Sequence, residues 1–196
     1  LASDIHGKNH HVSGSFSNHV RDVHLLTGAG EITIVDSSHH SELFRATAGG
    51  MGLTGIILSL SLRLIRVASS AINVETIRVS SLDEYLDLRE ENASNQYTVG
   101  WIDTMKRGRS LGRGLLFRGD HAPSGVSYHP TSVNKLPRRL FEAKLLRSNV
   151  LLNRVTLGLL NSAYYRRVLR RRQHKLIGFE PYFFQLDGLT NWNRLY

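Results

Sequence analysis

The clearest periodic pattern in this sequence is an alternation of leucine with polar residues that follows a glycine-rich turn. The leucines are Leu58, Leu60, Leu62 and Leu64, and the residues between them are Ser59, Ser61 and Arg63. A period of two residues is typical of a β-strand with one buried face, because successive side chains of a strand point to opposite faces of the sheet. We therefore predict a half-buried strand here, and we place the end of a first domain directly after it.

Other segments carry signals of the same kind. Residues 20–36 resemble two short strands joined by a loop with two glycines, which predicts a hairpin. Residues 37–50 begin with serines and end with a double glycine, which predicts a helix. A strand is predicted over residues 72–79, then a helix that begins at Ser81 with a glutamate three residues later, as in a capping box. Residues 96–103 alternate again and predict another strand.

The last third of the chain mixes loop and helix signals. We predict a short strand over residues 114–119, a largely helical stretch over residues 138–175, and a strand over residues 182–187. We predict an α+β fold. The domain prediction is residues 1–67 and residues 68–196.

The composition excludes several kinds of chemistry. The chain has no cysteine, which rules out disulfides, thiolate metal sites and cysteine nucleophiles within it. Any redox chemistry must therefore use a cofactor. The longest apolar stretch, residues 52–65, is interrupted by serines and an arginine, well short of the roughly 18 apolar residues that a membrane-spanning helix needs. We predict no membrane-spanning segment in this chain.

The charge is strongly positive, with 25 Lys and Arg against 16 Asp and Glu, a formal net charge of +9. Much of the excess lies in one run: Arg166, Arg167, Arg170, Arg171, Arg172 and Lys175. Such a run is either a solvated helix face or a surface that meets phosphate, anionic lipid or acidic protein. No aromatic interleaving or nucleic-acid motif accompanies it, so nucleic acid is not the expected partner.

The opening stretch DIHGKNHH is rich in histidine and leaves three interpretations open. His6 and His10 have the spacing of a helical zinc site, but Gly7 argues against a helix, and we predict no metal. A histidine could act as a general base, although no nucleophile arrangement accompanies it. Otherwise the stretch is a polar loop, or a cradle in which Gly7 and Gly14 let the backbone approach a ligand closely.

Several ordered motifs together resemble a known family. The stretches are ASDIHGKNHH, GSFSNHV, LLT-x-x-GEI, ELFRAT-x-GG and GLTGII, with a weaker likeness at QYTVGWID and LDGLTNWNRLY. In this order and at this spacing they are similar to the FAD-linked oxidoreductases of the vanillyl-alcohol-oxidase type. The resemblance implies the second half of a PCMH-type FAD-binding domain, followed by part of an antiparallel-sheet substrate domain, the cap. It also implies that the chain is an internal part of a longer oxidase and catalyses nothing alone.

The resemblance assigns roles to individual residues. It implies FAD contacts from Ser3, Asp4, Ile5, His6, Gly7 and Ile57. It implies substrate contacts from Lys8, Trp101 and Phe183, the last at a position where the family has tyrosine. A pocket serine of the family is Val99 here, which argues for a difference in substrate binding. The catalytic base is not identified.

The function implied by the resemblance is an FAD-dependent oxidation of a secondary alcohol. The substrate class is a sugar or polyol, including a lipid-phosphate-linked ribose of cell-wall precursor synthesis, and the hydride goes to flavin N5. With this function we also expect a partner reductase, a peripheral membrane contact, and a location in the cytoplasm or at the bacterial inner membrane. Two alternatives stay open: a module that binds anionic surfaces or nucleic acid through the basic run, and an inactive fragment.

Overall fold

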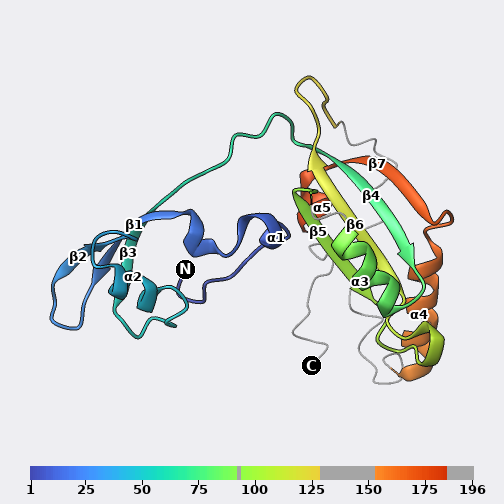
Figure 1. Ribbon diagram of the computed structural model, residues 1–196, viewed down its shortest axis with the longest axis horizontal. Coiled ribbons are helices and arrows are strands. Elements are labelled where there is room, and N and C mark those ends of the chain that lie inside the picture. Colours follow the sequence, from blue (N-terminus) through green and yellow to red (C-terminus); the bar gives the residue numbers. More distant parts are fainter. Residues whose placement is uncertain (92–93, 129–152, 185–196) are drawn as a thin grey trace, which may run out of the picture. The chain divides into compact units, whose positions relative to one another are not determined.

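A computed structural model describes residues 1–91, 94–128 and 153–184 of the chain. The chain divides into two compact units, Leu1–Arg66 and Val67–Tyr196. Each unit has its own antiparallel sheet (Figure 1). The chain is thus a mixed protein of helices and antiparallel sheets. The identities of the two units as a flavin-binding half-domain and a substrate cap stay predictions.

The first unit contains a three-stranded sheet in the order β2-β1-β3. Its elements are α1 (His10–Ser13), the 3₁₀ helix η1 (Phe16–His19), β1 (Val20–Leu26), β2 (Ile32–Val35), α2 (Ser41–Thr47) and β3 (Ile56–Leu62). The predicted hairpin is confirmed as β1 and β2, whose turn is closed by the amide of Thr27 donating to the carbonyl of Glu31. The predicted helix is confirmed as α2, and its Phe44 packs on the sheet in a core with Val20, Val23 and Val35.

The leucine-rich strand is confirmed as β3, but the alternation of leucine with polar residues does not decide which of its side chains are buried. Leu25 of β1 pairs with Ile57 and His24 pairs with Ser59, so Leu58 is an extra residue without a partner across the ladder. This bulge reverses the facing of side chains around it. Ile57 therefore packs on the core, whereas Leu58 is 50% exposed. The prediction of one buried leucine face is therefore wrong at Leu58 because of the bulge, and Leu62 and Leu64 at the end of the segment are exposed as well.

The second unit contains a four-stranded sheet in the order β5-β6-β4-β7. Its strands are β4 (Ala71–Val79), β5 (Tyr97–Ile102), β6 (Gly114–His121) and β7 (Arg172–Gly178). Its helices are α3 (Leu82–Glu91), the 3₁₀ helix η2 (Gly108–Ser110), α4 (Arg154–Arg166) and α5 (Phe179–Phe183). The predicted strands before and after α3, and the strand at β6, are confirmed.

Helices cover both faces of this sheet because its strands carry apolar side chains on both faces. On β4, Ile77 and Val79 face α3, where they meet Leu88. Ile72 and Val74 point the other way, into a cluster that contains side chains of α4 and α5. The predicted capping serine also acts as expected, since the Ser81 hydroxyl accepts from the Glu84 amide, although the Glu84 carboxylate binds Ser80 instead of completing the box.

The C-terminal predictions were partly wrong. The helix predicted over residues 138–175 is present as α4, while residues 138–152 lie outside the described residues. Residues 172–178 form strand β7 and not helix, because they pair with β4 at the edge of the sheet. Charged side chains are usual on an edge strand, where they oppose further strand pairing. The strand predicted over residues 182–187 is helical at Tyr182 and Phe183, and its remainder is outside the described part.

None of the described helices is long and apolar enough to cross a membrane.

Candidate functional site

Asp4 organises the N-terminal loop that contains most of the predicted cofactor contacts. Its carboxylate accepts hydrogen bonds from the Ser17 amide at 2.8 Å, the Ser15 hydroxyl at 2.8 Å and the Ser17 hydroxyl at 3.0 Å. Next to it, the carbonyl of Ile5 accepts from the amide of Phe16 at 2.8 Å. These contacts join the two ends of the segment from residue 5 to residue 16, so this segment is a closed loop. We call it the histidine loop.

The electrostatics of Asp4 agree with this structural role. Burial by itself would raise the pKa of the Asp4 carboxyl, but the hydrogen bonds from Ser15 and Ser17 outweigh it, and the pKa is lowered. A carboxylate that accepts several hydrogen bonds prefers its charged form. Asp4 also has a left-handed backbone, with φ of 38°. Aspartate tolerates this conformation better than most residues do, and it directs the chain into the loop.

The N-terminal segment also joins the glycine-rich turn before β3. The Gly49 amide donates to the Leu1 carbonyl at 3.1 Å, and the Met51 amide donates to the Ala2 carbonyl at 2.8 Å. The start of the stretch ASDIHGKNHH is therefore bound, within one unit, to the turn that leads into GLTGII. Ser3 lies between these contacts and Asp4, and its side chain is exposed.

A hollow of about 400 Å³ opens beside Asp4. It is lined by Asp4, Ser17, Asn18, Val20, Ser37, Phe44, Arg45, Ala48 and Arg63. Two cationic side chains thus border it, and neither forms an ion pair with any residue in the described ranges. Asp4 is the only predicted cofactor residue in this lining, so the hollow and the outer face of the histidine loop are distinct surfaces.

The histidine loop presents its other predicted contacts outward. Ile5 is 65% exposed although it is apolar, and His6 and Gly7 are exposed as well. The rings of His6 and His10 lie 4.2 Å apart at an angle of 38°, but no helix spans them, since α1 begins only at His10. Within the part of the chain that the structure describes, no three metal-ligating side chains cluster.

Lys8 is half-buried at the same loop, and burial lowers the pKa of its ammonium group. Ile57 lies elsewhere in the first unit: its backbone pairs with Leu25 in the sheet, and its side chain packs on the core. Ile57 therefore offers a ligand little besides its backbone. The roles that the resemblance gives to these two residues stay predictions.

Trp101 and Phe183, the other predicted substrate contacts, are brought to one face of the four-stranded sheet. The Trp101 ring lies 4.7 Å from that of Tyr164, and the Phe183 ring lies 4.8 Å from that of Tyr97. Both pack at the edge of the same apolar cluster and both are half-buried. The predicted shared face of the residues at 97, 99 and 101 is confirmed by their common packing there.

Sequence reasoning missed two polar groups in this unit. The Tyr97 hydroxyl lies 3.2 Å from Nε2 of His121, whose Nδ1 lies 2.9 Å from the Ser69 carbonyl. Burial and the nearby charge of Asp120 raise the pKa of Tyr97. The only local signal was an aromatic residue at the start of a predicted strand, and the strand that supplies His121 is far away in sequence.

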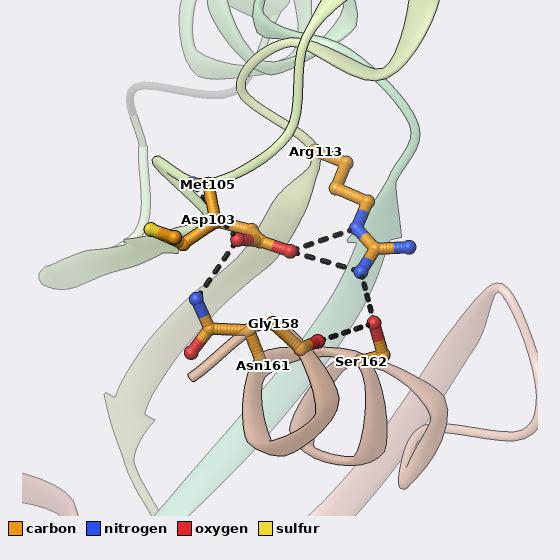
Figure 2. A network of polar contacts seen from close by, with 6 residues as sticks. All are labelled: Asp103, Met105, Arg113, Gly158, Asn161 and Ser162. Atoms are coloured by element: carbon orange, nitrogen blue, oxygen red, sulfur yellow. Dashed lines mark hydrogen bonds and ion pairs between the residues drawn. The ribbon is translucent and has the colours of Figure 1, made fainter. Parts of the chain in front are cut away.

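The second missed group is a buried network around Asp103 (Figure 2). Asp103 is fully buried and binds Arg113, while Asn161 of α4 donates to its other oxygen at 2.9 Å. Ser162, also on α4, accepts from Arg113 at 2.9 Å. These hydrogen bonds fix α4 to the loop between β5 and β6.

The chain is similar to known proteins over its whole length. Decaprenylphosphoryl-beta-D-ribose oxidase from Mycolicibacterium smegmatis is 33% identical over 204 residues, which cover 100% of this chain and 44% of that protein. An uncharacterized protein in the mprA 5' region of Streptomyces coelicolor is 33% identical over 201 residues, which cover 96% of this chain and 54% of that protein. The chain thus spans about half the length of the curated relatives it matches. No family model matches it. The first match confirms the resemblance inferred from the ordered motifs.

Proposed function

We propose that this chain is part of an FAD-dependent oxidoreductase that oxidises a secondary alcohol of a sugar or polyol. The unit Leu1–Arg66 would be the second half of a PCMH-type FAD-binding domain, and the unit Val67–Tyr196 would be part of the substrate cap. The relative from M. smegmatis is named for a lipid-phosphate-linked ribose. We infer the same class of substrate here, with a partner reductase as one route for the electrons.

The observation that carries the proposal is the closed histidine loop. Asp4 and Ile5 are bound to Ser17 and Phe16, so the loop is fixed at its base while its outer residues stay uncovered. An exposed apolar side chain two residues from a glycine allows a planar ring to approach the backbone closely. These features fit a flavin. Ile5, His6 and Gly7 would hold its ring system, with Ser3 beside them and the backbone at Ile57 farther along the cofactor.

When bound, FAD supplies the acceptor for the hydride that leaves the carbinol carbon. The residues of this chain then bind and orient the alcohol. Lys8 would hold the hydroxyl or the phosphate of the substrate through its ammonium group, and a base that the sequence does not identify would take the hydroxyl proton. In the unit Val67–Tyr196, Trp101 and Phe183 would contribute apolar contacts to the substrate.

Flavin retention tests the proposal most directly. The complete polypeptide that contains this chain is purified without added flavin, and the released cofactor is identified by chromatography and quantified by its visible absorbance. About one FAD per polypeptide is the expected result. A polypeptide that folds but holds no flavin, even after incubation with FAD, would overturn the proposal.

The substrate class needs a separate measurement. Under anaerobic conditions the flavin spectrum is followed while sugars, polyols and a ribose linked to a lipid phosphate are added in turn. Bleaching by an alcohol of this panel is expected, because a reduced flavin accumulates when no acceptor is present. A bound FAD that none of these alcohols reduces would leave a flavoprotein whose substrate class we have assigned wrongly.

A further inference from the structure

The segment Arg154–Gly178 contains no Asp or Glu, and it carries seven cationic side chains. They are Arg154, Arg166, Arg167, Arg170, Arg171, Arg172 and Lys175. Arg171 and Arg172 form ion pairs with Glu84 and Glu75. None of the other five forms an ion pair with a residue that the structure describes. This end of the second unit therefore has a concentrated positive charge that the fold leaves largely unbalanced.

Large apolar side chains lie exposed in the same segment. On α4, Val155 is 71%, Leu159 is 66% and Leu160 is 56% exposed, and they share the outer arc of the helix with Arg166. The chain then leaves α4 through a short loop that leads into β7 (Figure 1). Leu169 in this loop is 81% exposed. An exposed apolar group of this kind marks an interaction surface. We call α4 with this loop the arginine–leucine surface.

Among the residues that the structure describes, the core clusters do not include the outer arc of α4. The opposite arc of the helix binds the sheet, through Asn161 and Ser162 in the Asp103 network and through the rings of Tyr164 and Tyr165. Arg167 stacks on Tyr164 with its guanidinium carbon 3.7 Å from the ring centre. The helix is thus fixed in rotation, and Val155, Leu159 and Leu160 are held on the outside.

A hollow of about 510 Å³ lies next to the arginine–leucine surface, lined by Arg78, Ser80, Glu84, Tyr165 and Arg171. Glu84 is already bound to Arg171 and to Ser80. Arg78 donates to the carbonyl of Val168 at 3.1 Å, which aims its guanidinium along the base of the loop. Arg171 is thus paired within the fold, whereas Arg78 forms no ion pair with a residue that the structure describes and is the guanidinium group that an anionic headgroup could reach here.

We propose that the arginine–leucine surface docks on a bilayer of anionic phospholipid. Leu169 and the outer leucines of α4 enter the region between the headgroups, and the arginines contact the lipid phosphates. An interfacial helix combines these two features, an apolar arc and flanking Lys or Arg. A nucleic acid would use the cations but would gain nothing from four exposed aliphatic side chains. This inference goes beyond the proposed oxidation and holds whether or not the chain binds flavin.

Vesicle flotation tests the docking with the complete polypeptide. Vesicles of pure phosphatidylcholine are compared with vesicles that contain a third of phosphatidylglycerol, in a salt series. Binding to the anionic vesicles is expected, weakening as salt is added, with little binding to the neutral ones. The pair Arg166→Gln and Arg170→Gln should weaken binding by about 25-fold, since each arginine near an anionic surface contributes about fivefold. Leu169→Ser should weaken it about tenfold or more.

Matched controls come from the same unit. Arg89→Gln and Leu86→Ser remove an exposed arginine and an exposed leucine of α3, which covers the opposite face of the sheet from α4, and both should bind vesicles like the unchanged protein. Equal binding to neutral and anionic vesicles, or no loss in the Leu169 variant, would refute the proposal. Two other results would also refute it. One is a Leu169 variant that binds vesicles normally but changes from dimer to monomer. The other is tighter binding of duplex DNA than of anionic vesicles, with the affinity for DNA undiminished in the Leu169 variant.

Discussion

Arg113 donates two hydrogen bonds to the same carboxylate oxygen of Asp103, from Nε at 3.0 Å and from Nη2 at 2.9 Å (Figure 2). The other oxygen of Asp103 accepts from Asn161 and from the Met105 amide. Burial would raise the pKa of the Asp103 carboxyl, but the hydrogen bonds from Asn161 and Arg113 outweigh it and lower the pKa. The carboxylate is thus held in its charged form at the point where α4 meets the sheet.

Removal of this carboxylate should destabilise the second unit strongly. Asp103→Ala leaves the guanidinium of Arg113 in a nearly buried site without its charge partner, and we expect a loss of about 3–5 kcal/mol in the free energy of unfolding. Urea unfolding of the complete polypeptide, followed by far-UV circular dichroism, measures the loss. Asp87→Ala on the exposed side of α3 is the matched control and should cost less than about 0.5 kcal/mol. Similar losses in the two variants would contradict the role of the pair.

The same pair should make stability depend on pH in acid. The folded-state pKa of Asp103 is below its ordinary value of 3.8, so its contribution is fully present above that value and is lost as the pH falls through the folded pKa. Asp103→Asn has no such group. The difference in unfolding free energy between the unchanged protein and this variant should be constant near neutral pH and should shrink below about pH 4. A difference that stays constant into strong acid would show that the carboxylate is not held as described.

Asp4 should affect flavin retention because it holds the histidine loop closed. Asp4→Asn replaces an acceptor of three hydrogen bonds, so the base of the histidine loop loosens and the exposed residues lose their fixed positions. We expect the affinity for FAD to fall by about tenfold, equal to about 1.4 kcal/mol. Fluorescence titration of the flavin-free polypeptide with FAD measures it.

Asp22→Asn supplies the control for that experiment. Asp22 also accepts a hydrogen bond from a serine, Ser61 at 2.9 Å, but this contact joins β1 and β3 away from the loop. FAD affinity should be unchanged in this variant. If the two variants lower the affinity equally, the effect comes from general destabilisation of the unit and the histidine loop has no special part in it.

The elements that the sequence predicts well are those set by neighbouring residues. The hairpin after Val20 follows from two glycines between β-rich segments, and the start of α3 follows from the Ser81 hydroxyl that accepts from its own first turn. Both signals act within a few residues, so a local pattern contains the information.

The elements that the sequence predicts badly depend on distant partners. The bulge at Leu58 arises from pairing with β1, and the basic strand β7 forms only because β4 offers an open edge. Asp103 and Asn161 are likewise far apart in sequence. No window of adjacent residues shows these contacts, so the helical prediction continues past the end of α4 into the arginines of β7.

The candidate site was predicted only through the resemblance. A histidine-rich stretch alone left metal, base and loop interpretations open, and the ordered motifs selected the cofactor role. The structure adds the reason why Asp4 belongs there, since it binds Ser15 and Ser17 and closes the loop. The contacts of His6 and Lys8 with cofactor and substrate stay predictions.

Two glycines of the GLTG turn should differ sharply in their tolerance of a side chain. Both have positive φ, +82° at Gly52 and +147° at Gly55. An added Cβ at Gly52 meets nothing within 4 Å, so Gly52→Ala costs only backbone strain, about 1–2 kcal/mol. At Gly55 the Cβ would lie 2.3 Å from the backbone oxygen of Leu26, which the sheet holds in place. Gly55→Ala should therefore cost about 3 kcal/mol or more.

Parallel urea unfolding of the two alanine variants measures this difference, because the substitution is identical and only the surroundings change. The turn leads directly into β3, so a shift of Gly55 also disturbs the pairing of Ile56 with Leu26. Gly55→Ala should consequently lose protection from hydrogen exchange at the start of β3, whereas Gly52→Ala should keep it. Equal costs, or a larger cost at Gly52, would mean that the turn can move away from β1 and that its close approach there is not a constraint of the fold.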